Sequence, residues 1–108
     1  MQSGSYHLHS SIVIDTGANL VPIILHGENW GGIDGGATIT GEFAGYLVDF
    51  HSTSDIAFRC GVRDLSFDGV TQALTQHGVR FGYVEFGFID RCSFREFDNG
   101  IALGKVGA

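Results

Sequence analysis

The stretch "VRDLSFDG" (residues 62–69) has a counterpart further along the chain, "IDRCSFRE" (residues 89–96). At a shift of 27, Ser66 aligns with Ser93 and Phe67 aligns with Phe94. The charged residues recur with their signs reversed. The three aligned pairs of opposite charge are Arg63 with Asp90, Asp64 with Arg91, and Asp68 with Arg95. A segment that repeats its apolar residues and inverts its charges is predicted to lie beside its own copy.

Parallel stacking of the two segments explains this pattern. In parallel strands placed side by side, each residue neighbours its equivalent, and opposite charges there contribute about 0.2–1 kcal/mol whereas like charges repel. The alternation predicts that Leu65 and Phe67 point inward and that Asp64, Ser66 and Asp68 point outward. Burial of a Phe contributes about 1.5–3 kcal/mol. We therefore expect the inner residues to provide stability and the charge pairs to fix the register.

The alignment extends in both directions from this segment. Downstream, the same shift of 27 continues, whereas upstream the best match moves to a shift of 28, which predicts a β-bulge between the two. A period of this length is typical of a solenoid, in which each repeat forms one turn. The extended pairs are Val70 with Phe97, Leu74 with Ile101, Ile56 with Val84, and Phe58 with Phe86.

The remainder of the chain reads as short β-runs that end at Gly, Asn or Asp. Its 108 residues include 17 Gly and 1 Pro, which indicates many tight turns. Residues 69–78 come nearest to a helical pattern but also fit a turn between strands. No linker divides the chain. We predict an all-β fold, a right-handed single-stranded parallel β-helix of about four coils, formed by residues 1–108 as one module.

Charge and hydropathy exclude some classes of function. Six Lys and Arg against 12 Asp and Glu give a net charge of −6, which argues against a nucleic-acid partner. The longest apolar run, residues 20–25, is too short for a signal peptide or a membrane span. Three interpretations stay open: export by another route, a role inside the cell, or membership of a longer chain. Cys60 and Cys92 form no CxxC motif, so we expect no disulfide and interpret Cys92 as a small buried hydrophobe.

Four segments together resemble a known family: "IDGGATITG" (33–41), "GYLVDF" (45–50), "DIAFRCGVRDLSFDG" (55–69) and "CSFREFDNGIAL" (92–103). They are similar to the right-handed parallel β-helices of the pectate-lyase-like superfamily, and most of all to bacteriophage tail spikes and capsule depolymerases. The resemblance implies binding of bacterial surface polysaccharide, cleavage by hydrolysis or elimination, and a homotrimer on the virion tail or outside the cell. Members of that family stack more coils, so a segment of a longer protein and a short module with ends covered by a partner are both open.

Cleavage of a glycosidic bond requires two carboxylates on either side of it. The carboxylates of the charge-inverted repeat are explained by pairing, and Asp49 is explained in the same way if it lies beside Arg80. Asp98 suits a turn before Gly100. Glu85 and Glu96 remain as the candidate catalytic residues, with Glu85 expected to lie outward between aromatic residues.

Three aromatic residues are candidates for substrate binding, because aromatic rings stack on sugar rings: Trp30, Tyr46 and Tyr83. Packing within the fold is the alternative role for each. His7, His9 and His26 could approach one another, but no further ligands stand at metal-binding spacing, so we predict no metal site. No phosphate-binding loop occurs, and no cofactor is predicted.

Three functions follow as hypotheses. The first is a tail-spike-like module that binds and cleaves polysaccharide. The second is a non-catalytic scaffold or receptor-binding module. The third is a cellular carbohydrate-active enzyme of the same fold.

Overall fold

The computed structural model describes residues 1–15, 23–28, 36–51, 57–69, 75–82 and 84–103, and in these ranges the chain is all-β, with no helix. Every strand pairing in these ranges is parallel, which is the pairing that the inverted charges predicted. The strands are β1 (Gly4–Leu8), β2 (Ile12–Asp15), β3 (Ile24–His26), β4 (Ala37–Gly41), β5 (Gly45–His51), β6 (Ala57–Phe58), β7 (Gly61–Arg63), β8 (Leu65–Gly69), β9 (Gln76–Gly82), β10 (Val84–Glu85), β11 (Phe88–Asp90), β12 (Ser93–Arg95) and β13 (Asn99–Leu103).

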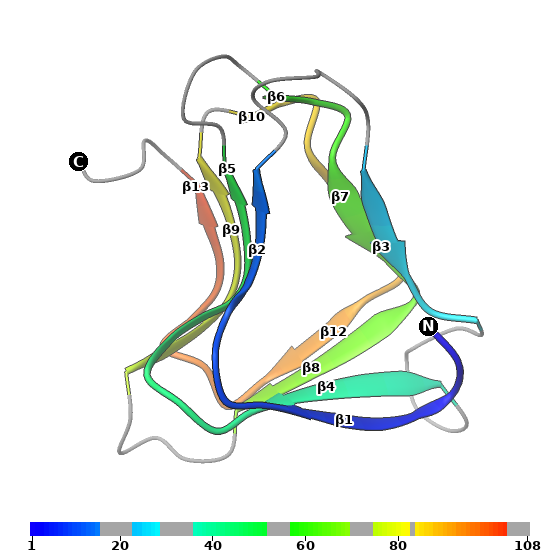
Figure 1. The fold of residues 1–108 in the computed structure, drawn as a ribbon, viewed down its shortest axis with the longest axis vertical. Helices are drawn as coiled ribbons and strands as arrows, with labels where there is room; N and C mark the ends of the chain where they lie inside the picture. The colour runs from blue at the N-terminus through cyan, green and yellow to red at the C-terminus, as the bar shows by residue number, and fades with distance from the viewer. Residues whose placement is uncertain (16–22, 29–35, 52–56, 70–74, 83, 104–108) are drawn as a thin grey trace.

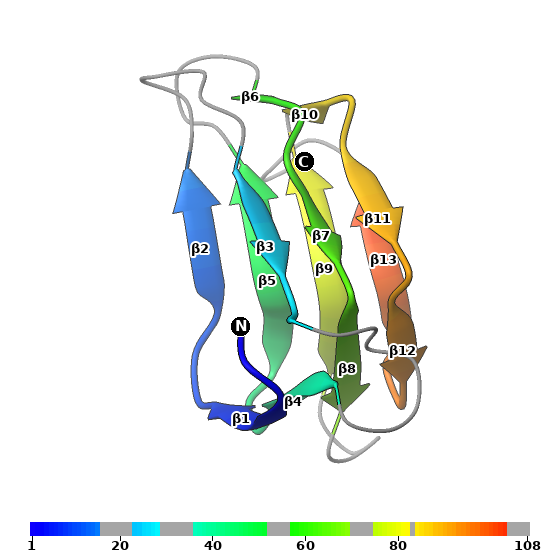
Figure 2. The same ribbon diagram turned by 90° about the vertical axis from the view of Figure 1, so that its right-hand side faces the viewer.

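The strands form three main sheets that the chain visits in rotation. Their orders are β1-β4-β8-β12, β13-β9-β5-β2 and β11-β7-β3, and a two-stranded sheet joins β10 to β6. Viewed end-on, the three main sheets form the three sides of a triangle (Figure 1). We call each passage of the chain around this triangle a circuit, and Figure 2 shows the strands of successive circuits side by side. This arrangement is consistent with a parallel β-solenoid.

The register predicted from the repeated segment is confirmed. Phe94 lies opposite Phe67 and Ser93 lies opposite Ser66 in the β12–β8 pairing. The two Phe rings stack with centroids 5.0 Å apart and planes 9° apart, while the Ser93 hydroxyl lies 2.9 Å from the Ser66 hydroxyl. Like residues therefore form ladders on both faces of this sheet.

The three inverted charge pairs are also confirmed as ion pairs. The distances from nitrogen to oxygen are 3.3 Å for Arg63–Asp90, 2.8 Å for Arg91–Asp64 and 4.0 Å for Arg95–Asp68.

Asp64, which alternation placed among the outward-pointing residues, is buried, with 9% of its surface exposed. It lies at the corner between β7 and β8 with a φ of 57°. Its N–H donates a hydrogen bond to the Asp90 carbonyl, and the Arg91 side chain pairs with its carboxylate. The burial of Asp64 therefore comes from the corner and its ion pair, which alternation along a strand does not predict.

Two alignments outside the central repeat were wrong. Upstream, Val84 pairs with Ala57 and not with Ile56, so the shift stays at 27 and no bulge is needed. Downstream, Ile101 pairs with Val79, a shift of 22. The connection from Phe67 to Val79 is therefore longer than the equivalent connection from Phe94 to Ile101, and the corner between the two sheets absorbs the difference. Val70 and Leu74, which the prediction paired here, lie outside the described residues.

Inward-facing side chains of the three sheets meet in one core. Leu65, Phe67 and Val79 are at most 1% exposed, and the Phe50 and Phe81 rings stack at 5.3 Å. The core also holds the buried side chain of Gln76, whose amide donates hydrogen bonds to two backbone carbonyls, those of Gly41 and Phe43. A buried amide that is bonded in this way fixes the corner where β4 turns into β5.

The corners repeat their backbone conformation from one circuit to the next. Arg59 and Phe86 are equivalent at the shift of 27 and have φ values of 55° and 58°, and Asp64 and Arg91 are equivalent in the same way, with 57° and 52°. This left-handed region is costly for residues with a side chain, by about 1–2 kcal/mol. This strained backbone turns the chain at the corners. The strands between the corners can then stack in register, which offsets the strain.

Gly61 shows how closely the strands stack. A Cβ atom at this position would lie 2.4 Å from the carbonyl oxygen of Phe88 in the adjacent strand. The Phe88 ring covers the space that a side chain at Gly61 would occupy, and the Arg63 guanidinium lies 5.4 Å from the centre of that ring. Glycine is therefore required at this point of β7.

Substitution of Phe86 by Gly is expected to stabilise the protein. Phe86 is 74% exposed and has a φ of 58°, so Gly relieves backbone strain at little cost in burial. The greater chain entropy of Gly offsets part of this gain, which leaves about 0.5–1 kcal/mol. Urea unfolding should show a higher midpoint for Phe86→Gly than for Phe86→Ala, which keeps the strained Cβ. Equal midpoints would contradict the strain.

Candidate functional site

A group of polar and aromatic side chains lies on the outer face of the β13-β9-β5-β2 sheet. Asp49 stands between the core residues Val48 and Phe50, and Arg80 stands between Val79 and Phe81, so both point away from the core. Adjacent to them are an aromatic, an imidazole and an amide side chain. We call the group the Tyr46 cluster: Tyr46, Asp49, His77, Arg80 and Asn99.

Strand register brings the cluster together. Tyr46 on β5 is opposite His77 on β9, and His77 is opposite Asn99 on β13. The Tyr46 and His77 rings stack with centroids 4.8 Å apart, and the Asn99 amide nitrogen lies 3.2 Å from Nδ1 of His77. The cluster therefore crosses three neighbouring strands in one row.

Arg80 connects this row to a buried carboxylate. Its Nε and Nη2 donate hydrogen bonds to the two oxygens of Asp49 at 2.9 and 2.6 Å, and its guanidinium carbon lies 4.4 Å from the centre of the Tyr46 ring. The hydrogen bond to Asp49 raises the pKa of Arg80 above its usual value. The predicted Asp49–Arg80 pair is thus confirmed, and it holds the Tyr46 ring in place.

The cluster has the chemistry of a binding surface. It presents a partly exposed tyrosine ring, an imidazole and an exposed amide, which can stack on and hydrogen-bond to a ligand. Both oxygens of Asp49 are occupied by Arg80, and the His51 Nδ1 lies 3.6 Å from one of them. An occupied carboxylate is poorly suited to act as a nucleophile or a base.

The other predicted site residues are placed as follows. Trp30 and Tyr83 lie outside the described residues, as does the side chain of Glu85, whose backbone belongs to β10. Glu96 is exposed and directly follows β12 with a φ of 63°. The backbone of Glu85 lies at the corner occupied by β6 and β10, whereas Glu96 lies at the corner between β12 and β13 (Figure 1).

Sequence reasoning found Tyr46 but missed its partners His77 and Asn99. Tyr46 and His77 are related by a shift of 31, and His77 and Asn99 by a shift of 22, because the corners between these strands differ in length. A search at the shift of 27 cannot align them. The pair Asp49–Arg80, which could be aligned from the sequence, is also at a shift of 31. The same shift applied to Tyr46 would have identified His77.

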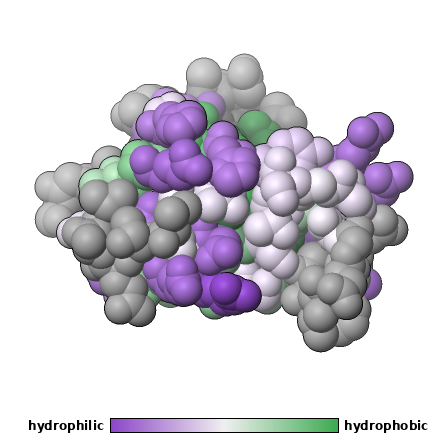
Figure 3. Space-filling view, turned by 90° about the horizontal axis from the view of Figure 1, so that it is seen from below, coloured by the Kyte–Doolittle hydropathy of each residue, from purple (hydrophilic) through white to green (hydrophobic). Residues whose placement is uncertain are grey.

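The outer face of the β1-β4-β8-β12 sheet carries rows of small polar and charged residues, and Figure 3 shows residues of hydrophilic and intermediate hydropathy over most of the coloured part of this side. Near its N-terminal edge, Glu42 lies 2.8 Å from His7 and 3.6 Å from His9. Within the described residues, no group of three or more potential ligands is placed to hold a metal ion. The rows on this outer face are, first, Ser5, Thr38, Ser66 and Ser93 and, next to it, His7, Thr40, Asp68 and Arg95.

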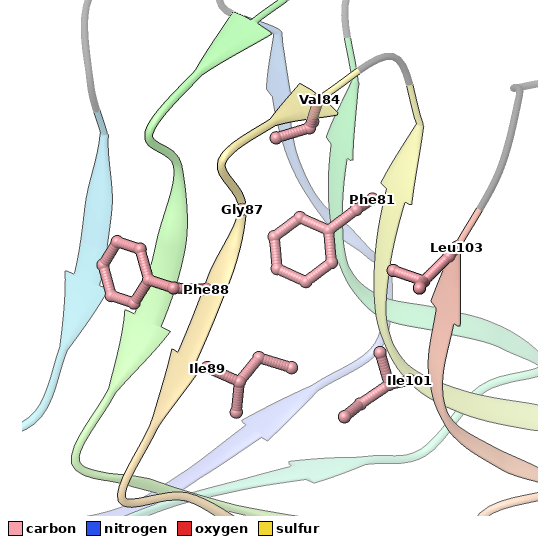
Figure 4. Close-up of a pocket in the computed structure, with 7 residues that line it drawn as sticks. All are labelled: Phe81, Val84, Gly87, Phe88, Ile89, Ile101 and Leu103. Carbon is pink, nitrogen blue, oxygen red and sulfur yellow. The ribbon is translucent and has the colours of Figure 1, made fainter.

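An apolar hollow of about 260 Å³ lies between the β9–β13 side and β11 (Figure 4). The side chains that surround it are all hydrocarbon, so only backbone groups could orient a substrate there. Its lining residues are Phe81, Val84, Gly87, Phe88, Ile89, Ile101 and Leu103.

Neither Cys60 nor Cys92 forms a disulfide. Cys92, which was predicted to be a small buried hydrophobe, is half-buried against the core, and its Sγ lies 3.3 Å from the Asp90 carbonyl oxygen. Burial raises the pKa of the Cys92 thiol. A thiol with a raised pKa is a poor nucleophile at neutral pH.

No helix in the described part of the chain is long and apolar enough to cross a membrane. Comparisons with protein-family models, with curated proteins and with solved structures found no match.

Removal of Arg80 is expected to be much more destabilising than removal of Arg95. Arg80→Ala leaves the 7% exposed Asp49 as a buried charge without its partner, which costs about 3 kcal/mol. Arg95 is 70% exposed and 4.0 Å from Asp68, so Arg95→Ala should change the free energy of unfolding by less than about 0.5 kcal/mol. Urea titrations of both variants measure the difference. Similar losses would show that the Asp49 pair has no special structural role.

The Cys92 thiol is expected to react slowly while the protein is folded. At pH 8 a chromogenic disulfide reagent should modify it more slowly than it modifies glutathione, because the raised pKa lowers the thiolate fraction. The same shift makes stability fall as the pH rises above the ordinary thiol value of about 8.5, where the unfolded chain loses the proton first. Below that pH the thiol is neutral in both states and contributes no pH dependence. Cys92→Ala is the control that should lack this component of the alkaline loss.

Proposed function

We propose that the chain is a right-handed parallel β-helix module of about four coils that binds bacterial surface polysaccharide. The parallel sheets visited in rotation support this fold, as do the segments that resemble pectate-lyase-like proteins and phage tail spikes. The proposed setting is a homotrimer on a virion tail or outside a cell.

The Tyr46 cluster is the observation on which the binding proposal rests. Sugar rings bind to proteins through an aromatic face together with a few hydrogen-bonding groups. Tyr46, His77 and Asn99 supply such groups in one row across β5, β9 and β13. Arg80 and Asp49 hold the ring before a ligand arrives, which lowers the entropy cost of binding.

The charge of the chain narrows the class of polysaccharide. Its net charge of −6 repels acidic polymers over a range of about 8–10 Å at ordinary ionic strength. The guanidinium of Arg80 is neutralised by Asp49 and does not provide a free anion site. A neutral glycan is the proposed ligand.

Binding alone, with the coils as a scaffold, is favoured over a depolymerase that also cleaves the polysaccharide. Asp49, Asp64, Asp68 and Asp90 are all engaged in ion pairs. Of the carboxylates proposed for catalysis, Glu85 is the last residue of β10 and Glu96 follows β12, so their backbones lie at different corners. A glycosidase of either stereochemistry needs its two carboxyl groups within about 5–10 Å of each other. These features support the binding module over the depolymerase.

Substitution of Tyr46 by Ala is expected to weaken glycan binding about tenfold, the loss of roughly 1–1.5 kcal/mol of aromatic stacking. Titration calorimetry with neutral and acidic capsular polysaccharides of defined length measures the change. Tyr46→Phe keeps the ring and is the matched control, for which we expect an affinity within about twofold of the wild type.

Circular dichroism must show that each variant is folded. If folded Tyr46→Ala binds as tightly as the wild type, the Tyr46 cluster is not the site. If the wild type binds none of the polysaccharides, the proposed function is wrong. Incubation with the bound polysaccharide followed by size-exclusion chromatography tests cleavage. A fall in polymer length that Glu85→Gln or Glu96→Gln abolishes would favour the depolymerase over the binding module.

A further inference from the structure

The two ends of the molecule carry unpaired strand edges. Each four-stranded sheet begins with a strand of the first circuit, β1 or β2, and ends with a strand of the last, β12 or β13. Each of these four strands has a neighbour on one side only among the described residues (Figure 2). Edges of this kind present rows of N–H and C=O groups that can pair with another strand.

Exposed apolar side chains are concentrated at the same two ends. Within the described residues, all six large hydrophobic residues that are exposed lie on the first circuit or on and beside the last strands of the sheets. The described parts of the middle strands contribute none. At the first end these residues are Val13, Ile23 and Ile24, and at the other end they are Phe86, Ile101 and Leu103.

The ends match each other when the existing register is continued. In the β13-β9-β5-β2 sheet, one inward column runs from Ile14 through Phe50 and Phe81 to Leu103. A second copy stacked on β13 would place its Ile14 beside Leu103 and, in the same way, its Ile12 beside Ile101. Apolar columns would then continue from one copy into the next without a break.

The β1-β4-β8-β12 sheet matches in the same orientation. Its inward column runs from Tyr6 through Ile39 and Phe67 to Phe94, so a second copy would place Tyr6 beside Phe94. This contact extends the stack of Phe67 on Phe94 by a further aromatic ring. On the outer side, Ser5 would continue the hydroxyl row that ends at Ser93.

We propose that the C-terminal end of one copy binds the N-terminal end of a second copy, with β1 added to β12 and β2 added to β13. The third sheet has one strand fewer, and the Glu28 N–H is bonded there to the Met1 carbonyl, so the junction consists of the two four-stranded sheets. The apolar hollow lies where the third sheet ends at β11, and Leu103 on its rim becomes covered (Figure 4).

A second copy fits these ends better than an extended peptide or a small apolar ligand does. A single extended peptide would continue only one sheet, and a small apolar ligand in the hollow would leave both strand edges unpaired. A second copy provides two parallel strands at the correct spacing, with apolar residues in the matching columns. This inference follows from the strand edges and does not depend on glycan binding.

The proposed contact joins unlike surfaces and therefore does not close. Head-to-tail contacts between identical chains produce open series of dimers, trimers and longer assemblies as the concentration rises. A homotrimer formed through the sides of the molecule would instead stop at three copies. The two modes of association differ in their dependence on concentration.

Sedimentation velocity of the 108-residue chain across about three decades of concentration tests the proposal, and the wild type should form an open series. Leu103→Asp places a charge at a side chain that is 79% exposed and should shift the sample to monomer. Ala44→Asp adds the same charge at an exposed corner of a middle circuit and is the control expected to behave as the wild type.

A second pair of variants tests the register. The outward column from Val13 through Asp49 and Arg80 to Ala102 predicts that Val13 of one copy lies beside Ala102 of the next. The double variant Val13→Lys with Ala102→Asp should attract across the junction, and within each chain it sets the new charges beside the opposite charges of Asp49 and Arg80, so it should associate about threefold more tightly than the single variant Val13→Lys. Both variants should show the same circular dichroism as the wild type.

Several results would overturn the proposal. A wild type that is monomeric at every concentration, or a side-to-side trimer that does not associate further as the concentration rises, excludes an open head-to-tail contact. So does association that Leu103→Asp leaves unchanged, or that Ala44→Asp weakens to the same extent. If a fluorescent apolar dye binds the monomeric wild type and not Leu103→Asp, the hollow is a ligand pocket and not a junction.

Discussion

The structure depends on one constraint, that each residue of a strand lies beside its counterpart in the next circuit. Parallel pairing holds neighbouring strands about 4.8 Å apart, so side chains in one column touch whether or not they attract one another. Phe67 stacked on Phe94 and Ser66 bonded to Ser93 are the favourable outcome for like residues. Charged residues satisfy the same constraint only if their signs alternate along the column, as they do from Asp68 to Arg95.

Corners allow this constraint to hold while the circuits differ in length. Counterparts follow at a shift of 27 for Phe67 and Phe94 but at a shift of only 22 for Val79 and Ile101. The extra residues are accommodated between the strands, which keep their register. The left-handed backbone at Asp64 and Arg91 turns the chain at equivalent points, and the energy of stacking in the adjacent strands outweighs the strain of about 1–2 kcal/mol at each.

The difference between strands, which keep their register, and corners, which vary in length, explains what the sequence could predict. Where successive circuits have the same number of residues, one fixed shift aligns the residues that touch. The parallel register and the ion pairs of the repeat were predicted in this way. The burial of Asp64 was not predictable from alternation, because corner geometry decides it. The Tyr46 cluster was found only in part, since unequal corners conceal the relation of Tyr46 to His77 and Asn99. The catalytic roles of Glu85 and Glu96 stay predictions.

One column of the β13-β9-β5-β2 sheet shows that charges lie in its central strands and not in its edge strands. The ion pair of Asp49 and Arg80 occupies the two central strands, where each charge has its partner within the chain. The end positions of the same column are Val13 and Ala102, which carry no charge. A charge at an end would have no partner on the outer side within its own chain. If another molecule covered that end, the charge would be buried there without a partner unless the other molecule supplied one. Uncharged ends are therefore compatible with both the isolated chain and a stacked copy, whereas the charged middle of the column holds the Tyr46 ring in place on the side of the molecule.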